Sequence, residues 1–168
     1  MDAEMSSLVV KLIASILSPL VEWIKERIAR SWYRRLKWII LDGEYRNDKF
    51  VFHLEAKLKV LAVGFFDGRI KCLEGKIKNT LRSPVSPGIG EQAATEDVQG
   101  VMEGINIHLI TMSIDVPGVI VPSSYLINLS LNRKKFIGTN LALEPAADKG
   151  AVGWLKGEVT VRCTDKDS

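Results

Sequence analysis

The period of the apolar residues divides the chain into two parts, and the change falls near Trp38. In residues 5–36 the apolar side chains recur every three to four positions, which is typical of an amphipathic helix. Ser18 and Pro19 interrupt this stretch with the residue pair that favours a helix N-cap and first position. We therefore predict an N-terminal amphipathic helix with a kink or a break at Pro19.

After Trp38 the apolar period becomes two, which is typical of half-buried β-strands. The clearest alternation covers Phe50, Phe52, Leu54, Ala56, Leu58 and Val60. Three further strands are predicted with inward faces at Tyr125, Ile127, Leu129 and Leu131, at Ile137, Thr139, Leu141 and Leu143, and at Leu155, Val159, Val161 and Cys163. Strands near 70–81 and 104–116 each change face once, which indicates a β-bulge in each.

Six or seven strands with no helix between them predict a mainly β fold, in which one antiparallel domain is β-sandwich-like or a small barrel. We assign residues 1–38 to a helical attachment segment and residues 39–168 to this antiparallel β-domain. Residues 83–100 are rich in Pro, Gly and small polar residues, so we expect a long surface loop there.

Composition is that of an ordinary globular protein, with 46% hydrophobic and 26% charged residues. The charge is unevenly distributed: the first 41 residues hold seven basic and four acidic side chains, which accounts for the whole net charge of +3. The basic residues at the end of the helical stretch, with no acidic residue among them, are Arg27, Arg30, Arg34, Arg35 and Lys37. We expect these side chains to contact any anionic partner.

The apolar and aromatic residues of the N-terminal segment are the predicted anchor for a partner. They are Val9, Ile13, Ile16, Leu20, Trp23, Ile24, Ile28 and Trp32. Three kinds of partner suit this anchor and its basic flank. The first is protein, which includes the β-domain itself, a second copy and another chain. The second is an anionic membrane surface, and the third, which is less favoured, is nucleic acid. The ten residues between Lys11 and Glu22 are too few to span a bilayer, which takes about 18 to 20.

Motifs for chemistry are weak. The stretch Gly88–Ala93 matches the G-x-G-x-x-A pattern of dinucleotide sites, but prolines precede it where a strand is needed, so we reject that interpretation. His53 and His108 are expected to be exposed strand residues with no metal ligands around them. Cys72 and Cys163 fit no metal or redox spacing and are expected to be buried, reduced thiols.

These observations predict a non-enzymatic attachment or assembly module without a cofactor. The N-terminal segment would dock to protein or to a membrane surface, while the β-domain would present a binding surface. The alternative is a nucleic-acid-binding protein that uses the basic end of the helix. Asp2 and Glu4 oppose a secretory signal, so we expect a cytoplasmic protein, in one variant peripheral at the inner face of a membrane. Nothing in the sequence indicates a small-molecule substrate.

Overall fold

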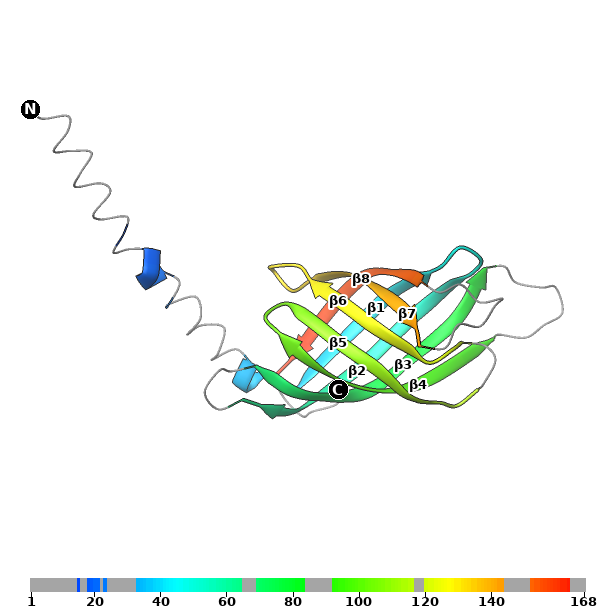
Figure 1. Cartoon of the computed structure of the whole chain (residues 1–168), viewed down its shortest axis with the longest axis horizontal. Helices are drawn as coiled ribbons and strands as arrows, with labels where there is room; N and C mark the ends of the chain where they lie inside the picture. Colours follow the sequence, from blue (N-terminus) through cyan, green and yellow to red (C-terminus); the bar gives the residue numbers. More distant parts are fainter. Residues whose placement is uncertain are drawn as a thin grey trace, which may run out of the picture.

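The structure is a computed structural model, and it describes residues 15, 18–21, 23, 33–64, 69–83, 92–116, 120–143 and 152–163. From Trp38 onward, the described residues include eight strands that wrap around a common axis (Figure 1). The strands are β1 (Trp38–Arg46), β2 (Val51–Val63), β3 (Ile70–Ser83), β4 (Ala93–Glu103), β5 (Asn106–Ile114), β6 (Ser123–Leu129), β7 (Lys135–Ala142) and β8 (Val152–Arg162).

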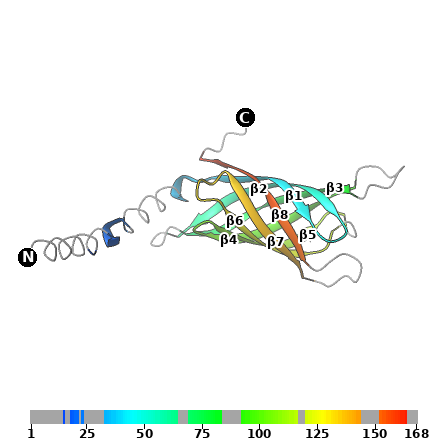
Figure 2. The same cartoon turned by 90° about the horizontal axis from the view of Figure 1, so that it is seen from above.

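The sheet is a closed barrel, because each strand pairs antiparallel with the next one and β1 also pairs with β8. β1 and β8 lie side by side in Figure 2. Their pairing runs from Trp38 opposite Arg162 to Arg46 opposite Trp154. Closure means that the described sheet has no edge strand, since each strand has a neighbour on both sides. The prediction of a mainly β, antiparallel domain is therefore confirmed in its barrel form, and the sandwich-like form is wrong.

Glycines on β1 and β8 allow these strands to close around a large core side chain. Gly43 and Gly157 face each other across the two strands, beside the buried ring of Phe136. A Cβ added to Gly43 would lie 2.8 Å from the Gly157 Cα and 2.9 Å from the Phe136 Cζ. The absence of side chains here thus provides the space that the Phe136 ring occupies.

The alternation in β2 and β6 is as predicted, with Phe52, Leu54 and Tyr125 among the buried residues. Both predicted bulges are also present. In β3 the register shifts between Ile70 and Leu73. In β5, Thr111 lies opposite Val98 and Ser113 lies opposite Asp97, so one extra residue is accommodated between them.

The predicted loop at residues 83–100 is wrong for its second half, because residues from Ala93 onward form β4. This strand raises the number to eight in the described chain, from the six or seven expected. Its inward positions are Ala94, Glu96, Val98, Gly100 and Met102. A carboxylate, an alanine and a glycine at inward positions weaken the apolar alternation by which a strand is recognised.

The predicted face of β7 is also wrong. Phe136 and Asn140 point inward, whereas Ile137, Leu141 and the following Leu143 are exposed. Gly138 and Asn140 occupy inward positions, so the outer positions of this strand are the more apolar ones. Leu131 lies exposed in the turn before β7, and Cys163 is exposed after β8, although both were predicted to be inward.

Residues 33–36 cover one end of the barrel, which we call the closed end. Tyr33 and Leu36 are buried in the same core as the strands, and the Tyr33 hydroxyl donates a hydrogen bond to the Gly104 carbonyl between β4 and β5. Lys37 continues this attachment through its backbone: its N–H donates to the Arg162 carbonyl at 2.9 Å. The end of the predicted helical segment is therefore part of the β-domain's core.

Residues 15, 18–21, 23 and 33–35 are helical. Most of the predicted helix over residues 5–36 lies outside the described residues, so the continuous amphipathic helix stays a prediction. Within the described part of the chain, no helix has the length and apolar character needed to cross a membrane.

Candidate ligand-binding site

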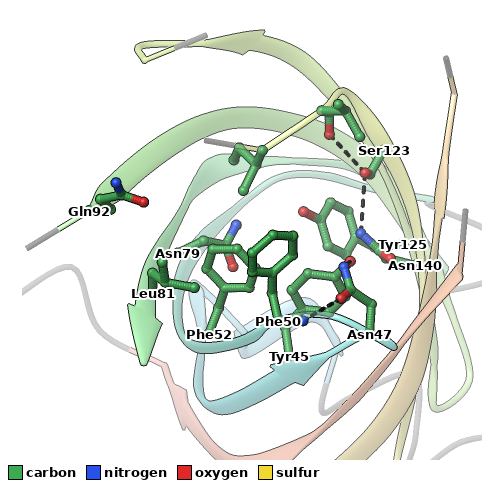
Figure 3. Close-up of a pocket in the computed structure, with 12 residues that line it drawn as sticks. Tyr45, Asn47, Phe50, Phe52, Asn79, Leu81, Gln92, Ser123, Tyr125 and Asn140 are labelled. Carbon is green, nitrogen blue, oxygen red and sulfur yellow. Dashed lines mark hydrogen bonds between the residues drawn. The ribbon is translucent and has the colours of Figure 1, made fainter. Parts of the chain in front are cut away.

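A cavity of about 200 Å³ lies at the end of the barrel opposite the closed end, where β1 leads into β2 (Figure 3). Its lining comes from β1, β2, β3, β6 and β7 and from the segments that adjoin them. The lining residues are Tyr45, Asn47, Phe50, Phe52, Asn79, Leu81, Gln92, Ile120, Val121, Ser123, Tyr125 and Asn140.

Aromatic rings gather along one side of the cavity, as Figure 3 shows. The rings of Tyr45 and Phe52 are stacked, with centroids 5.5 Å apart and an interplanar angle of 19°. Phe50 adds a tilted ring, with its centroid 6.1 Å from that of Phe52. With Tyr125, these side chains give the cavity a wall that suits an apolar or aromatic ligand.

Polar groups across the cavity hold one another in position. The Asn140 Nδ2 donates to the Ser123 Oγ at 3.2 Å, and this hydroxyl donates to the Val121 carbonyl at 2.9 Å (dashed lines in Figure 3). On the aromatic side, the Asn47 Nδ2 donates to the Tyr45 hydroxyl at 3.2 Å. The polar lining is thus ordered before any ligand binds, which lowers the entropy lost on binding.

The floor of the cavity rests on a buried carboxyl group. Glu96 points inward from β4, is 0% exposed, and accepts hydrogen bonds from three strands. The Asn79 Nδ2 donates to Oε1 at 2.8 Å, the Tyr125 hydroxyl donates to the same oxygen, and the Thr111 hydroxyl donates to Oε2. All three donors are neutral. Glu96 therefore lies directly beneath Asn79 and Tyr125, two residues that line the cavity.

Burial governs the ionisation of this group. Removal of Glu96 from water raises the pKa of its carboxyl group, although the hydrogen bonds from Thr111, Tyr125 and Asn79 act in the opposite direction. Burial also raises the pKa of Tyr125 well above its usual value, and the neighbouring Glu96 raises it further. The pKa of Tyr45 is raised for the same first reason. The hydroxyl groups of both tyrosines therefore stay neutral near neutral pH.

One polar atom of the floor lacks a partner. Asn79 is 1% exposed, and within the described part of the chain its Oδ1 has no hydrogen-bond donor. The contact of Nδ2 with the carboxyl group fixes which end of the amide points at Glu96. An unsatisfied buried acceptor is unfavourable, so this oxygen leaves an uncompensated negative partial charge under the cavity lining.

The predicted anchor and basic residues lie away from this cavity or outside the described residues. Leu20 and Trp23 are 47% and 53% exposed, and Arg34, Arg35 and Lys37 are exposed near the closed end. The remaining members, which are Val9, Ile13, Ile16, Ile24, Ile28, Trp32, Arg27 and Arg30, lie outside the described residues. The structure does not test this anchor.

The histidines and cysteines form no metal site among the described residues. His53 lies on the outer surface with Asp42 and Glu55 at 3.6 and 3.5 Å, and the His108 Nε2 is 3.0 Å from the Ser124 Oγ. Cys72 and Cys163 are free thiols. Cys72 is half-buried and Cys163 is exposed, so the expectation of burial is wrong for Cys163.

Sequence reasoning missed every residue of the cavity floor as a functional candidate. Glu96 was placed in a surface loop, where a carboxylate is unremarkable. Tyr125 was correctly predicted to point inward, but as a core residue. One signal was available in the sequence. Every second residue from Ala94 to Gly100, which gives Ala94, Glu96, Val98 and Gly100, forms the inward face of a strand with a carboxyl group in it.

No protein family, curated protein or solved structure matches this chain.

Proposed function

We propose that the barrel binds a small, largely apolar ligand in the cavity at the end opposite the closed end, which we call the open end. The observation that supports this proposal is an ordered cavity with an aromatic wall and a few fixed polar groups, which is the usual composition of small-molecule sites. Eight-stranded barrels have an interior that either is filled by side chains or holds one small ligand. In this barrel, side chains fill the interior at one end, and the other end has an unfilled cavity of ligand size.

The size of the cavity limits the ligand. Towards the closed end the interior is filled by large side chains such as Leu58, Leu73 and Met102. At the open end about 200 Å³ stays unfilled. For comparison, an apolar protein cavity of about 150 Å³ holds one benzene molecule. A single ring with a short substituent is therefore the expected size.

The hydrogen-bond partners of the polar groups in the lining favour ligand binding over catalysis, because they hold these groups in place without activating them. The Ser123 hydroxyl bonds with Asn140 and a backbone carbonyl, so no general base activates it among the described residues. Glu96 is held beneath the lining by three donors, and the two tyrosines remain neutral. The expectation that the protein is not an enzyme stays a prediction, and a small-molecule ligand is a candidate that the sequence did not indicate.

The test is a titration of ¹⁵N-labelled protein with monocyclic aromatic compounds that include neutral, cationic and anionic members. We expect amide shifts at Tyr45, Ser123 and Asn140 and none at Leu36 near the closed end. Leu81→Trp should fill the cavity and abolish the shifts. Leu126→Trp is the matched control, because Leu126 is exposed on the outer face of β6. Shifts that are absent for all compounds, or that persist in Leu81→Trp, would refute the proposal.

We further propose, as the sequence predicts, that the N-terminal segment attaches the barrel to protein partners or to a membrane surface. The exposure of the large apolar side chains of Leu20, Val21 and Trp23 favours this role, because such a cluster is unfavourable in water. The exposed Arg34 and Arg35 would contact anionic groups.

Light scattering after size exclusion and sedimentation with vesicles separate the two attachment modes. Assembly predicts a large oligomer that tolerates salt, whereas membrane attachment predicts vesicle binding that weakens as salt rises. A monomer that binds neither neutral nor anionic vesicles would contradict the attachment role. A shift of labelled DNA or RNA that disappears steeply with salt would instead favour the nucleic-acid alternative.

A further inference from the structure

We propose that the cavity selects organic ammonium ions, meaning a protonated amine or a quaternary ammonium group on a small apolar skeleton, over neutral and anionic molecules of the same size. This inference rests on the ligand-binding function proposed above and concerns the charge of the ligand. It follows from three features that meet at the floor and wall of one cavity: a buried carboxyl group with neutral neighbours, an unpartnered carbonyl oxygen, and a group of aromatic rings.

The first feature is the carboxyl group of Glu96. It is completely buried, and its hydrogen-bond partners Asn79, Thr111 and Tyr125 are all neutral. A buried carboxyl group either stays protonated, which the raised pKa of Glu96 favours, or is paired with a cation, because an unpaired charge is costly to desolvate. The described residues provide no such cation for Glu96. A positively charged ligand in the cavity directly above would supply it.

The second feature is the Oδ1 of Asn79. The amide group of this side chain donates to Glu96 through Nδ2, and its buried carbonyl oxygen has no donor to offset its negative partial charge. The donation to a carboxylate polarises the amide and makes this oxygen a stronger acceptor. A cation in the cavity is attracted by this uncompensated partial charge, because electrostatic attraction is stronger in a buried, low-dielectric site.

The third feature is the aromatic wall. The faces of aromatic rings carry partial negative charge and attract ammonium groups that lie within about 6 Å of the ring centroid. Tyr45, Phe50 and Phe52 form one contiguous group of rings in the lining, and Tyr125 lies between the cavity and Glu96. The same wall accepts the apolar skeleton of the ligand.

An anionic ligand would meet opposite conditions. The described lining contains no Lys, Arg or His side chain, so no cation would offset the charge of the ligand. Such a ligand would also lie close to the carboxyl group of Glu96. A neutral ligand would bind through its apolar surface without the charge-dependent contacts.

Three ligands of nearly equal size separate these cases: benzylammonium, benzyl alcohol and benzoate. Near neutral pH we expect calorimetry to give benzylammonium about tenfold higher affinity than benzyl alcohol, the ratio that corresponds to one charge-assisted contact. Benzoate should bind least. Equal affinities for benzylammonium and benzyl alcohol would overturn this inference and leave the ligand-binding function intact. Failure of all three to bind would overturn the ligand-binding function itself.

The variant Glu96→Gln keeps the size of the side chain and removes its charge. It should reduce the preference for benzylammonium over benzyl alcohol to about twofold or less. Asp97→Asn is the matched control, because Asp97 is the next residue on β4, faces solvent and bonds with Ser113 and Lys76. It should keep the preference. A preference that survives in Glu96→Gln would overturn the assignment to Glu96.

Two measurements keep the test decisive if Glu96→Gln folds poorly. Phe52→Leu should weaken the binding of phenyltrimethylammonium more than that of benzyl alcohol, since it removes a ring but keeps apolar volume.

The affinity of the wild-type protein for phenyltrimethylammonium, whose charge does not titrate, should fall as the pH is lowered and Glu96 becomes protonated. The groups that face Glu96 are Asn79, Thr111, Tyr125 and, further away, Tyr45; all stay neutral between about pH 4 and 8. Affinity that is flat over this range, together with equal losses in Phe52→Leu, would refute the inference.

Discussion

Leu36→Ala tests whether the end of the N-terminal segment is part of the barrel's core. Leu36 is 1% exposed at the closed end, three residues after the buried Tyr33. A Leu to Ala change at a fully buried site costs about 2 to 5 kcal/mol of unfolding free energy, because apolar contacts are lost and a cavity remains. The flanking strands are fixed by barrel pairing and can collapse little into that space, so we expect about 3 kcal/mol.

Urea unfolding followed by tryptophan fluorescence measures this difference. With a slope of about 2 kcal/mol per molar urea, the midpoint should fall by about 1 to 2 M. The melting temperature should fall by about 6 to 12 °C, at about 2 to 4 °C per kcal/mol for a chain of this size.

Arg35→Ala is the matched control for this experiment. Arg35 is the residue before Leu36, and its side chain is exposed. It should change the free energy of unfolding by no more than about 0.5 kcal/mol. If Leu36→Ala and Arg35→Ala destabilise the protein equally, residues 33–36 do not close the barrel, and the reasoning from burial fails. A large effect for Leu36→Ala alone would show that this part of the segment belongs to the β-domain.

Three further predictions follow from the open end of the barrel and from the N-terminal segment. Glu96 has a folded-state pKa above its usual value of 4.5, so the stability that it contributes is complete below about pH 4.5 and is lost as the pH rises through the folded-state pKa. Urea unfolding at several pH values should therefore show the wild-type free energy of unfolding falling relative to that of Glu96→Gln as pH rises, and parallel curves would contradict this. Gly153→Ala would place a Cβ 2.7 Å from the Cζ of Tyr45 and should displace that ring, which lowers the free energy of unfolding by about 1 to 3 kcal/mol. Ligand binding in the NMR titration should weaken, and unchanged binding would contradict the packing argument. Leu20→Asp should reduce oligomerisation or vesicle sedimentation far more than Arg34→Ala if apolar burial provides most of the attachment, and an unaltered Leu20→Asp protein would show that the predicted anchor is wrong.

Alternation was sufficient to predict strands wherever one face is apolar and the other polar. The best example is β2, where every second residue from Phe52 to Val60 is buried. The same reasoning failed for β7 and β4, because Gly138, Asn140, Glu96 and Gly100 stand at inward positions and do not carry an apolar signal. Polar inward residues are what a binding cavity requires, so the pattern is weakest where the candidate site lies.

The sequence by itself determined the start of the strands near Trp38, the antiparallel β class and the basic character of the N-terminal segment, because these depend on local period and local charge. The tertiary structure decided whether the sheet closes, since the pairing of β1 with β8 joins segments more than a hundred residues apart. It also decided the candidate site. Glu96 meets Asn79, Thr111 and Tyr125 across sequence separations of 17, 15 and 29 residues, and only the barrel register brings them together. The burial that makes this carboxyl group unusual is a property of the assembled strands, and no single stretch of sequence contains it.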